Sequence, residues 1–161
     1  MDLGTTITGL VIIGICILPY LVLKIKSKRR DKVLLQWLEK FALQHQSLIY
    51  QHDIWGNSAI GISADGAYVF AIRNANGTTK THIIHLHDIY FCRIVNANSA
   101  QSSFITTTKL ELQFTHRDAN KPDTFIEIYN AVYDGLTLTG ELQLIDKWHQ
   151  LINHRIGLNS K

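Results

Sequence analysis

The sequence predicts an α+β membrane protein, in which an N-terminal transmembrane helix is followed by an antiparallel β domain that ends in a helix. An apolar run without charged side chains extends from Leu3 to Leu23, alternating hydrophobic residues follow Ser47, and an amphipathic stripe covers about 140–156. The 161 residues leave room for one membrane segment and one compact domain. We therefore divide the chain into an anchor (1–24), a basic run with an amphipathic helix (25–46), and a β domain with its helix (47–161).

The first segment has the length and composition of a transmembrane helix. Leu3–Leu23 is rich in Ile, Leu and Val and supplies about the 20 residues that cross ~30 Å of hydrocarbon. A cleavable signal peptide is the alternative, but it would carry positive charge before the apolar run and small residues at a cleavage site after it. Here Asp2 is the only charge before the run, and the basic residues follow it. We therefore expect a single span in the cell (inner) membrane, with the N-terminus outside and the C-terminal domain in the cytoplasm.

Most of the excess positive charge lies directly after this span. The basic run consists of Lys24, Lys26, Lys28, Arg29, Arg30 and Lys32. From residue 33 onward, 10 Lys or Arg face 11 Asp or Glu, so the domain itself is nearly neutral. This distribution argues against a nucleic-acid partner. The run accounts for the predicted orientation of the span in the membrane. It could also contact anionic lipid headgroups weakly, at about 1 kcal/mol per charge.

A second helix is predicted between the basic run and the β domain. Over Asp31–Gln46, the apolar residues at helical spacing are Leu34, Trp37, Leu38, Phe41 and Ala42. We expect this helix to pack its Trp37 and Phe41 face onto the domain. Burial of the same stripe among lipid headgroups, as an interfacial helix, is the alternative.

Alternation then predicts six or seven antiparallel strands and the turns between them. The clearest strands are Ala59–Ser63, Tyr68–Arg73, Thr81–Leu86, Ile89–Val95, Lys109–His116 and Phe125–Tyr129. Turns are expected at Asp65-Gly66, Asn76-Gly77 and Lys121-Pro122-Asp123, and loops at Asn96–Ser103 and Asp134–Gly140. The closing helix carries the stripe Leu144, Ile145, Trp148, Leu151 and Ile152, which can cover one opening of the sheet.

This order of elements resembles the pleckstrin-homology (PH) superfold, in particular its bacterial and GRAM-like branches. The resemblance covers about 48–156 and is carried by the hairpin 59–70, by 84–89 and by the helix around Trp148. It implies a β sandwich or barrel with a C-terminal capping helix, used as a membrane adaptor that recognises protein or lipid headgroups. Lipid-binding members use Lys and Arg in the loop joining their first two strands, whereas the matching loop here, Ser63–Ala67, has none. A plain antiparallel α+β domain is the alternative.

The sequence offers little catalytic chemistry. It has no Gly-rich phosphate loop, no G-x-S-x-G, no H-E-x-x-H and no paired-cysteine spacing, so we expect neither an enzyme nor a cofactor. His85 and His87 share a predicted strand face and could supply two zinc ligands, while His82 faces the other way and His116 could lie on a nearby strand. Without a Cys or carboxylate in phase, we expect surface histidines and no metal. Cys92 has the pattern of a small core residue.

Three functions follow, in decreasing order of support from the sequence. The first is a membrane-tethered protein-interaction module, an adaptor or scaffold without catalytic activity, whose partner is another protein. The second is a lipid-headgroup sensor at the inner face of the membrane, which only the fold resemblance supports. The third is an enzyme of unrecognised type.

Overall fold

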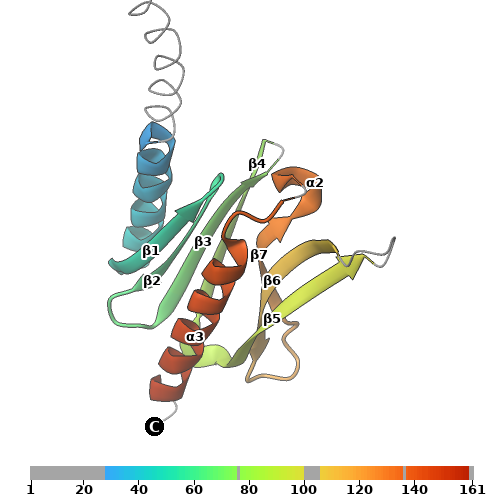
Figure 1. The fold of residues 1–161 in the computed structure, drawn as a ribbon. Coiled ribbons are helices and arrows are strands. Elements are labelled where there is room, and N and C mark those ends of the chain that lie inside the picture. Colours follow the sequence, from blue (N-terminus) through green and yellow to red (C-terminus); the bar gives the residue numbers. More distant parts are fainter. Residues whose placement is uncertain (1–27, 76, 100–105, 136, 160–161) are drawn as a thin grey trace, which may run out of the picture.

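The computed structural model describes residues 28–75, 77–99, 106–135 and 137–159. These residues form an α+β domain with two antiparallel sheets and a C-terminal helix (Figure 1). The predicted transmembrane segment Leu3–Leu23 and the basic residues Lys24 and Lys26 lie outside the described residues. Among the helices of the described ranges, none combines the length and the hydropathy that a bilayer crossing requires.

The strands follow one another in chain order within each sheet. The four-stranded sheet contains β1 (Ile49–Trp55), β2 (Ser58–Ser63), β3 (Tyr68–Ala75) and β4 (Thr78–His85). The three-stranded sheet contains β5 (Ile89–Ser99), β6 (Thr106–His116) and β7 (Thr124–Asn130). The 3-10 turn η1 (Leu86–Asp88) joins the two sheets. Within each sheet, neighbouring strands follow one another in the chain, and all paired strands are antiparallel.

The terminal helix α3 (Glu141–Asn159) closes one opening between the two sheets (Figure 1). Its stripe predicted the buried face correctly, because Ile145, Trp148 and Ile152 are buried in the main core. Trp148 Nε1 also donates a hydrogen bond of 2.8 Å to Asp53 Oδ2 on β1, so this closing helix is tied to both sheets.

A helix over residues 28–44 packs against the outer face of the four-stranded sheet. Its contacts are made by Leu38 and Ala42, both fully buried, and Phe41 is partly buried beside them. The expectation that Trp37 also packs there is wrong, because its side chain is 61% exposed. Leu38 takes the inward position because Gly61 below it has no Cβ: such an atom would lie 2.9 Å from Leu38 Cδ2.

The sequence pattern did not locate strand β1, so the loop predicted to be the first in the sheet is the second. The connection between the first two strands is the short turn Gly56-Asn57, whereas Ser63–Ala67 joins β2 to β3. The expectation that Ser63–Ala67 joins the first two strands is therefore wrong. The first turn carries no cation of its own either.

Three further boundaries can be compared with the sequence prediction. The Asp65-Gly66 turn is confirmed, with Gly66 at φ 70° and Ala67 N donating to Asp65 Oδ1. The expected loop from Asn96 instead continues β5 to Ser99, because its backbone pairs with β6. Asp134 ends a helical turn, α2 (Ala131–Asp134), whose start is capped by the Asn130 side chain accepting from Val132 N.

Candidate interaction surface

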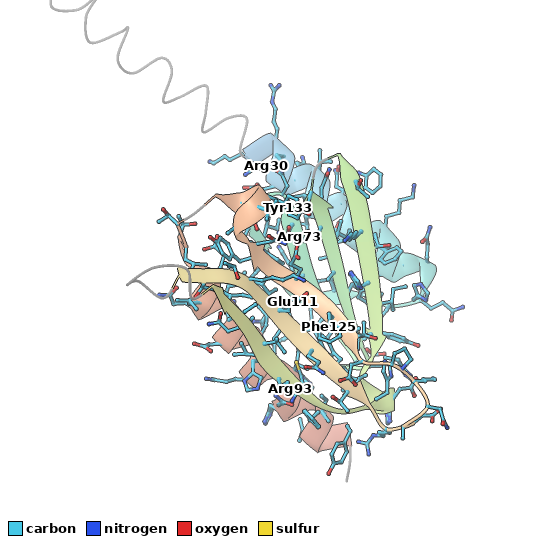
Figure 2. The ribbon with its side chains drawn as sticks, turned by 90° about the vertical axis from the view of Figure 1, so that its right-hand side faces the viewer. Arg30, Arg73, Arg93, Glu111, Phe125 and Tyr133 are labelled. Carbon is cyan, nitrogen blue, oxygen red and sulfur yellow. The ribbon has the colours of Figure 1, made fainter. Side chains whose placement is uncertain are left out.

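The opening that α3 leaves uncovered lies between β4 and β7, and we call it the open side. It contains a hollow of about 440 Å³ whose walls come from β3, β4, β6, β7 and α2. Figure 2 looks onto this side, where the labelled Arg73, Glu111, Phe125 and Tyr133 come from four different elements. The open side is therefore a concave surface to which both sheets contribute.

Arg73 forms the buried floor of the open side. It follows Val69 and Ala71 on the inward face of β3, where an apolar residue would normally stand. Its guanidinium is 2.9 Å from Glu127 Oε1 and 2.6 Å from Asp134 Oδ2. Because a buried charge is costly without such partners, the cluster holds β3, β7 and α2 in one arrangement and has a structural role.

Lys109 is neutralised by neighbouring carboxylates in the same way. Its Nζ lies 2.9 Å from Glu111 Oε1 and 3.5 Å from Glu127 Oε2. The hydrogen bond to Glu111 is the largest cause that raises the pKa of Lys109 above its ordinary value. Two of the cations lining the open side, Arg73 and Lys109, are therefore already occupied by acids.

Strand β4 contributes Lys80 and His82 to the same hollow. Burial is the main cause that lowers the pKa of His82, and the positive charge of Lys80 lowers it further. His82 is therefore neutral at pH 7. Within the described ranges, no carboxylate forms an ion pair with Lys80, so it is the cation of this hollow that remains available to a partner.

Aromatic side chains surround the charged floor. Phe125 and Tyr133 are exposed at the rim, and Trp55 is partly buried with its Nε1 donating a hydrogen bond of 2.7 Å to Ile128 O. Exposed aromatic residues beside a cation are enriched at protein interfaces.

A second hollow lies on the other face of β4. It occupies about 510 Å³ between the helix 28–44 and the sheet, with Trp37 and Phe41 on one wall and Ile72 and Thr81 on the other. The exposed Trp37 ring therefore borders a groove instead of covering the core. Strand β4 separates this apolar groove from the charged hollow of the open side.

The described part of the basic run lies at one end of the domain. Lys28, Arg29, Arg30 and Lys32 are exposed on the first turns of the helix 28–44. Arg29 and Arg30 line a small hollow together with Asn57 and Asn74, which lie on or beside the β1–β2 and β3–β4 turns.

The histidines that the sequence singled out do not form a group of metal ligands. Strand β4 ends at His85, and His87 lies in η1, so the two do not share a strand face as expected; their ring centroids are 5.7 Å apart. His85 stacks on Tyr68 at 4.9 Å, and its Nδ1 is 3.5 Å from Asp88 Oδ2. No group of three or more His, Cys, Asp or Glu suited to a metal occurs within the described ranges. His116 instead hydrogen-bonds Thr124 Oγ1 at 3.0 Å.

The expectation that Cys92 is a core residue is confirmed. It is buried in the main core, and burial raises the pKa of its thiol to about 12. Its backbone N–H and carbonyl are both bound by the side-chain amide of Asn153 on α3, at 3.0 and 2.8 Å. A reactive thiolate at this position is therefore disfavoured.

Comparisons with protein-family models, with curated proteins and with solved structures give no match to this chain. We therefore infer the function from the residues and their geometry.

Proposed function

We propose that this chain is a membrane-tethered adaptor, a protein-interaction module without catalytic activity, held at the cytoplasmic face of the inner membrane by a single N-terminal span. We further propose that its domain is a PH-like sandwich. Four plus three antiparallel strands followed by one capping helix support that assignment.

The tether and the domain are joined by a packed helix. The predicted span ends only a few residues before Lys28, and the helix 28–44 is fixed to the four-stranded sheet through Leu38 and Ala42. The end of the domain that carries Asn57 and Asn74 would therefore face the membrane. The exposed Lys28, Arg29, Arg30 and Lys32 could contact anionic headgroups at that surface.

One observation carries the preference for a protein partner: the open side combines exposed aromatic residues with charges that are already neutralised. Recognition of a phosphorylated headgroup needs several convergent cations that are free to bind phosphate. Arg73 and Lys109 are engaged by acids, which leaves Lys80 alone. Phe125 and Tyr133 instead offer the large amphipathic contact area that protein interfaces use.

A lipid-headgroup sensor is the second candidate, and it is favoured by a different place on the domain. Arg29 and Arg30 line a small hollow with Val33, Leu34, Asn57 and Asn74 at the end that would face the membrane. This site would bind one anionic headgroup at the membrane-facing end of the domain, and not on the open side.

The test is photocrosslinking of the full chain in its native membrane. A p-benzoylphenylalanine replaces Tyr133 on the open side, and the matched control carries it at Lys121, an exposed turn residue that lines none of the described hollows. The adaptor predicts protease-sensitive adducts with proteins at position 133 and far fewer at 121. Adducts of lipid mass alone at position 133, without protein adducts, would overturn the adaptor proposal.

A further inference from the structure

The outer edge of β4 is one of the sheet edges with which no strand pairs within the described residues. In the three-stranded sheet, Asn153 binds the Cys92 N–H and carbonyl at the edge of β5, and Trp55 and Arg73 both donate to Ile128 O at the edge of β7. Strand β4 is the last strand of its sheet, and within the described ranges no strand pairs with its outer edge. Unpaired backbone N–H and carbonyl groups along such an edge can accept another strand.

The two faces of β4 differ in chemistry. Lys80 and His82 point to the open side, whereas Thr81 points to the apolar groove beside Trp37. Ile83 follows Thr81 on that outer face by strand alternation and is 37% exposed. A strand added beside β4 would therefore place its own side chains alternately next to a cation and next to apolar groups.

We infer that the β4 edge binds an extended segment of a partner protein by strand addition, with acidic side chains toward Lys80 and apolar side chains toward Trp37 and Ile83. This inference rests on the proposed adaptor function and names its binding mode. Main-chain hydrogen bonds supply the affinity in such complexes, and the alternate side chains supply the specificity. Charge complementarity identifies the acidic face, since Lys80 has no carboxylate partner within the described ranges.

A second copy of the chain fits this edge less well than an acidic segment. If two β4 strands paired antiparallel about Thr81, each Lys80 would lie opposite a His82 of the other copy and diagonal to its Lys80. The like charges of the two Lys80 side chains oppose this pairing, whereas a partner with acidic residues beside Lys80 would be attracted.

The experiment measures binding of a fluorescein-labelled synthetic peptide, Thr-Val-Glu-Val-Glu-Val-Thr, to the full chain in lipid nanodiscs by fluorescence anisotropy. Lys80→Glu should weaken binding about tenfold, since attraction to the two glutamates becomes repulsion. The same charge change at the exposed turn residue, Lys121→Glu, should leave binding unchanged. A peptide with Lys in place of both Glu residues should bind the Lys80→Glu variant more tightly than the wild-type chain.

Two further peptides test the backbone contact itself. Each carries N-methyl groups on alternate residues, one set on the odd and one on the even positions. Strand addition uses the N–H groups of one set only, so one methylated peptide should lose binding and the other should keep it. Equal binding of both, or no effect of Lys80→Glu, would overturn the inference.

The remaining outcomes separate this inference from the proposed function. If the peptide does not bind while position 133 still crosslinks to proteins, the β4 inference fails and the adaptor survives. If position 133 crosslinks to lipid alone and the peptide does not bind, both fail. A disulfide between two Thr81→Cys chains in the membrane would assign the edge to a second copy and overturn the acidic partner.

Discussion

The packing of the helix 28–44 can be tested at two adjacent residues that the structure treats differently. Leu38 is fully buried against the four-stranded sheet, whereas Trp37 is mostly exposed. Removing a buried leucine side chain costs about 2 to 5 kcal/mol. Truncation of an exposed side chain changes the free energy of unfolding by only about 0.5 kcal/mol. Leu38→Ala should therefore destabilise the domain far more than Trp37→Ala, although tryptophan is the larger residue.

Urea unfolding of the full chain in detergent micelles measures this difference. With a urea dependence of about 1 to 3 kcal/mol per molar, the Leu38→Ala midpoint should fall by roughly 1 to 2 M. Near-ultraviolet circular dichroism reports the loss of fixed packing around the buried Trp148. Equal midpoints for Leu38→Ala and Trp37→Ala would refute the packing of this helix on the sheet.

A double-mutant cycle locates the contact more sharply. A methyl group at Gly61 would lie 2.9 Å from Leu38 Cδ2 and 3.2 Å from Ile49 Cγ2. Overpacking of this kind costs about 1 to 3 kcal/mol. Gly61→Ala should therefore destabilise the wild-type chain, and should cost clearly less in the Leu38→Ala background, where the nearest atom is gone. Additive effects would mean that the two residues do not touch.

Three other measurements test the open side and the core. Arg73→Met should lower the free energy of unfolding by about 2 to 3 kcal/mol. This loss is smaller than for a fully buried pair, because the carboxylate of Asp134 reaches solvent. The substitution should also speed amide exchange in α2, and unchanged exchange would contradict the structural role of the cluster. Cys16, the other cysteine, is replaced by serine so that only Cys92 can react. Cys92 should then react with a maleimide about a hundredfold more slowly in the folded chain than in urea, since burial raises its pKa. Rapid labelling of the folded chain would place the thiol at the surface. Because the pKa of His82 is lowered on folding, the unfolded chain binds more protons as the pH falls through the ordinary value of 6.5, so the urea midpoint should decrease as the pH is lowered below 6.5. An equal decrease in His82→Gln would assign the effect to another group.

The elements with strong periodicity could be predicted from the sequence. The hairpin around Asp65-Gly66 and the stripe of α3 depend on local alternation and helical spacing, which the sequence displays directly. Strand β1 was missed because exposed and half-buried positions follow one another without a clean hydrophobic alternation. Trp37 was misplaced because helical spacing defines a stripe and does not say which side of that stripe faces the sheet; the absence of a Cβ at Gly61 decides it.

The open side could be predicted only in part. Arg73 stands in phase with the core residues Val69 and Ala71, and an arginine at such a position indicates a buried, paired cation. Its partners could not be found in this way, because Glu127 and Asp134 are distant in sequence and meet Arg73 only when the two sheets face each other. The role of Lys80 likewise depends on which strand lies at the edge of the sheet, a property of topology that no local pattern contains.

The proposed membrane span would restrict the kind of partner that the β4 edge receives. The helix 28–44 and the strand β4 are each about 25 Å long, at 1.5 Å per helical residue and ~3.3 Å per strand residue. Both begin at the end of the domain that carries Asn74 and the basic residues, so the β4 edge would run from the membrane surface to the far end of the domain. A segment paired along it would have one end beside the membrane. A partner anchored in the same membrane could then present that segment at high effective concentration, which compensates for the modest affinity of a single added strand.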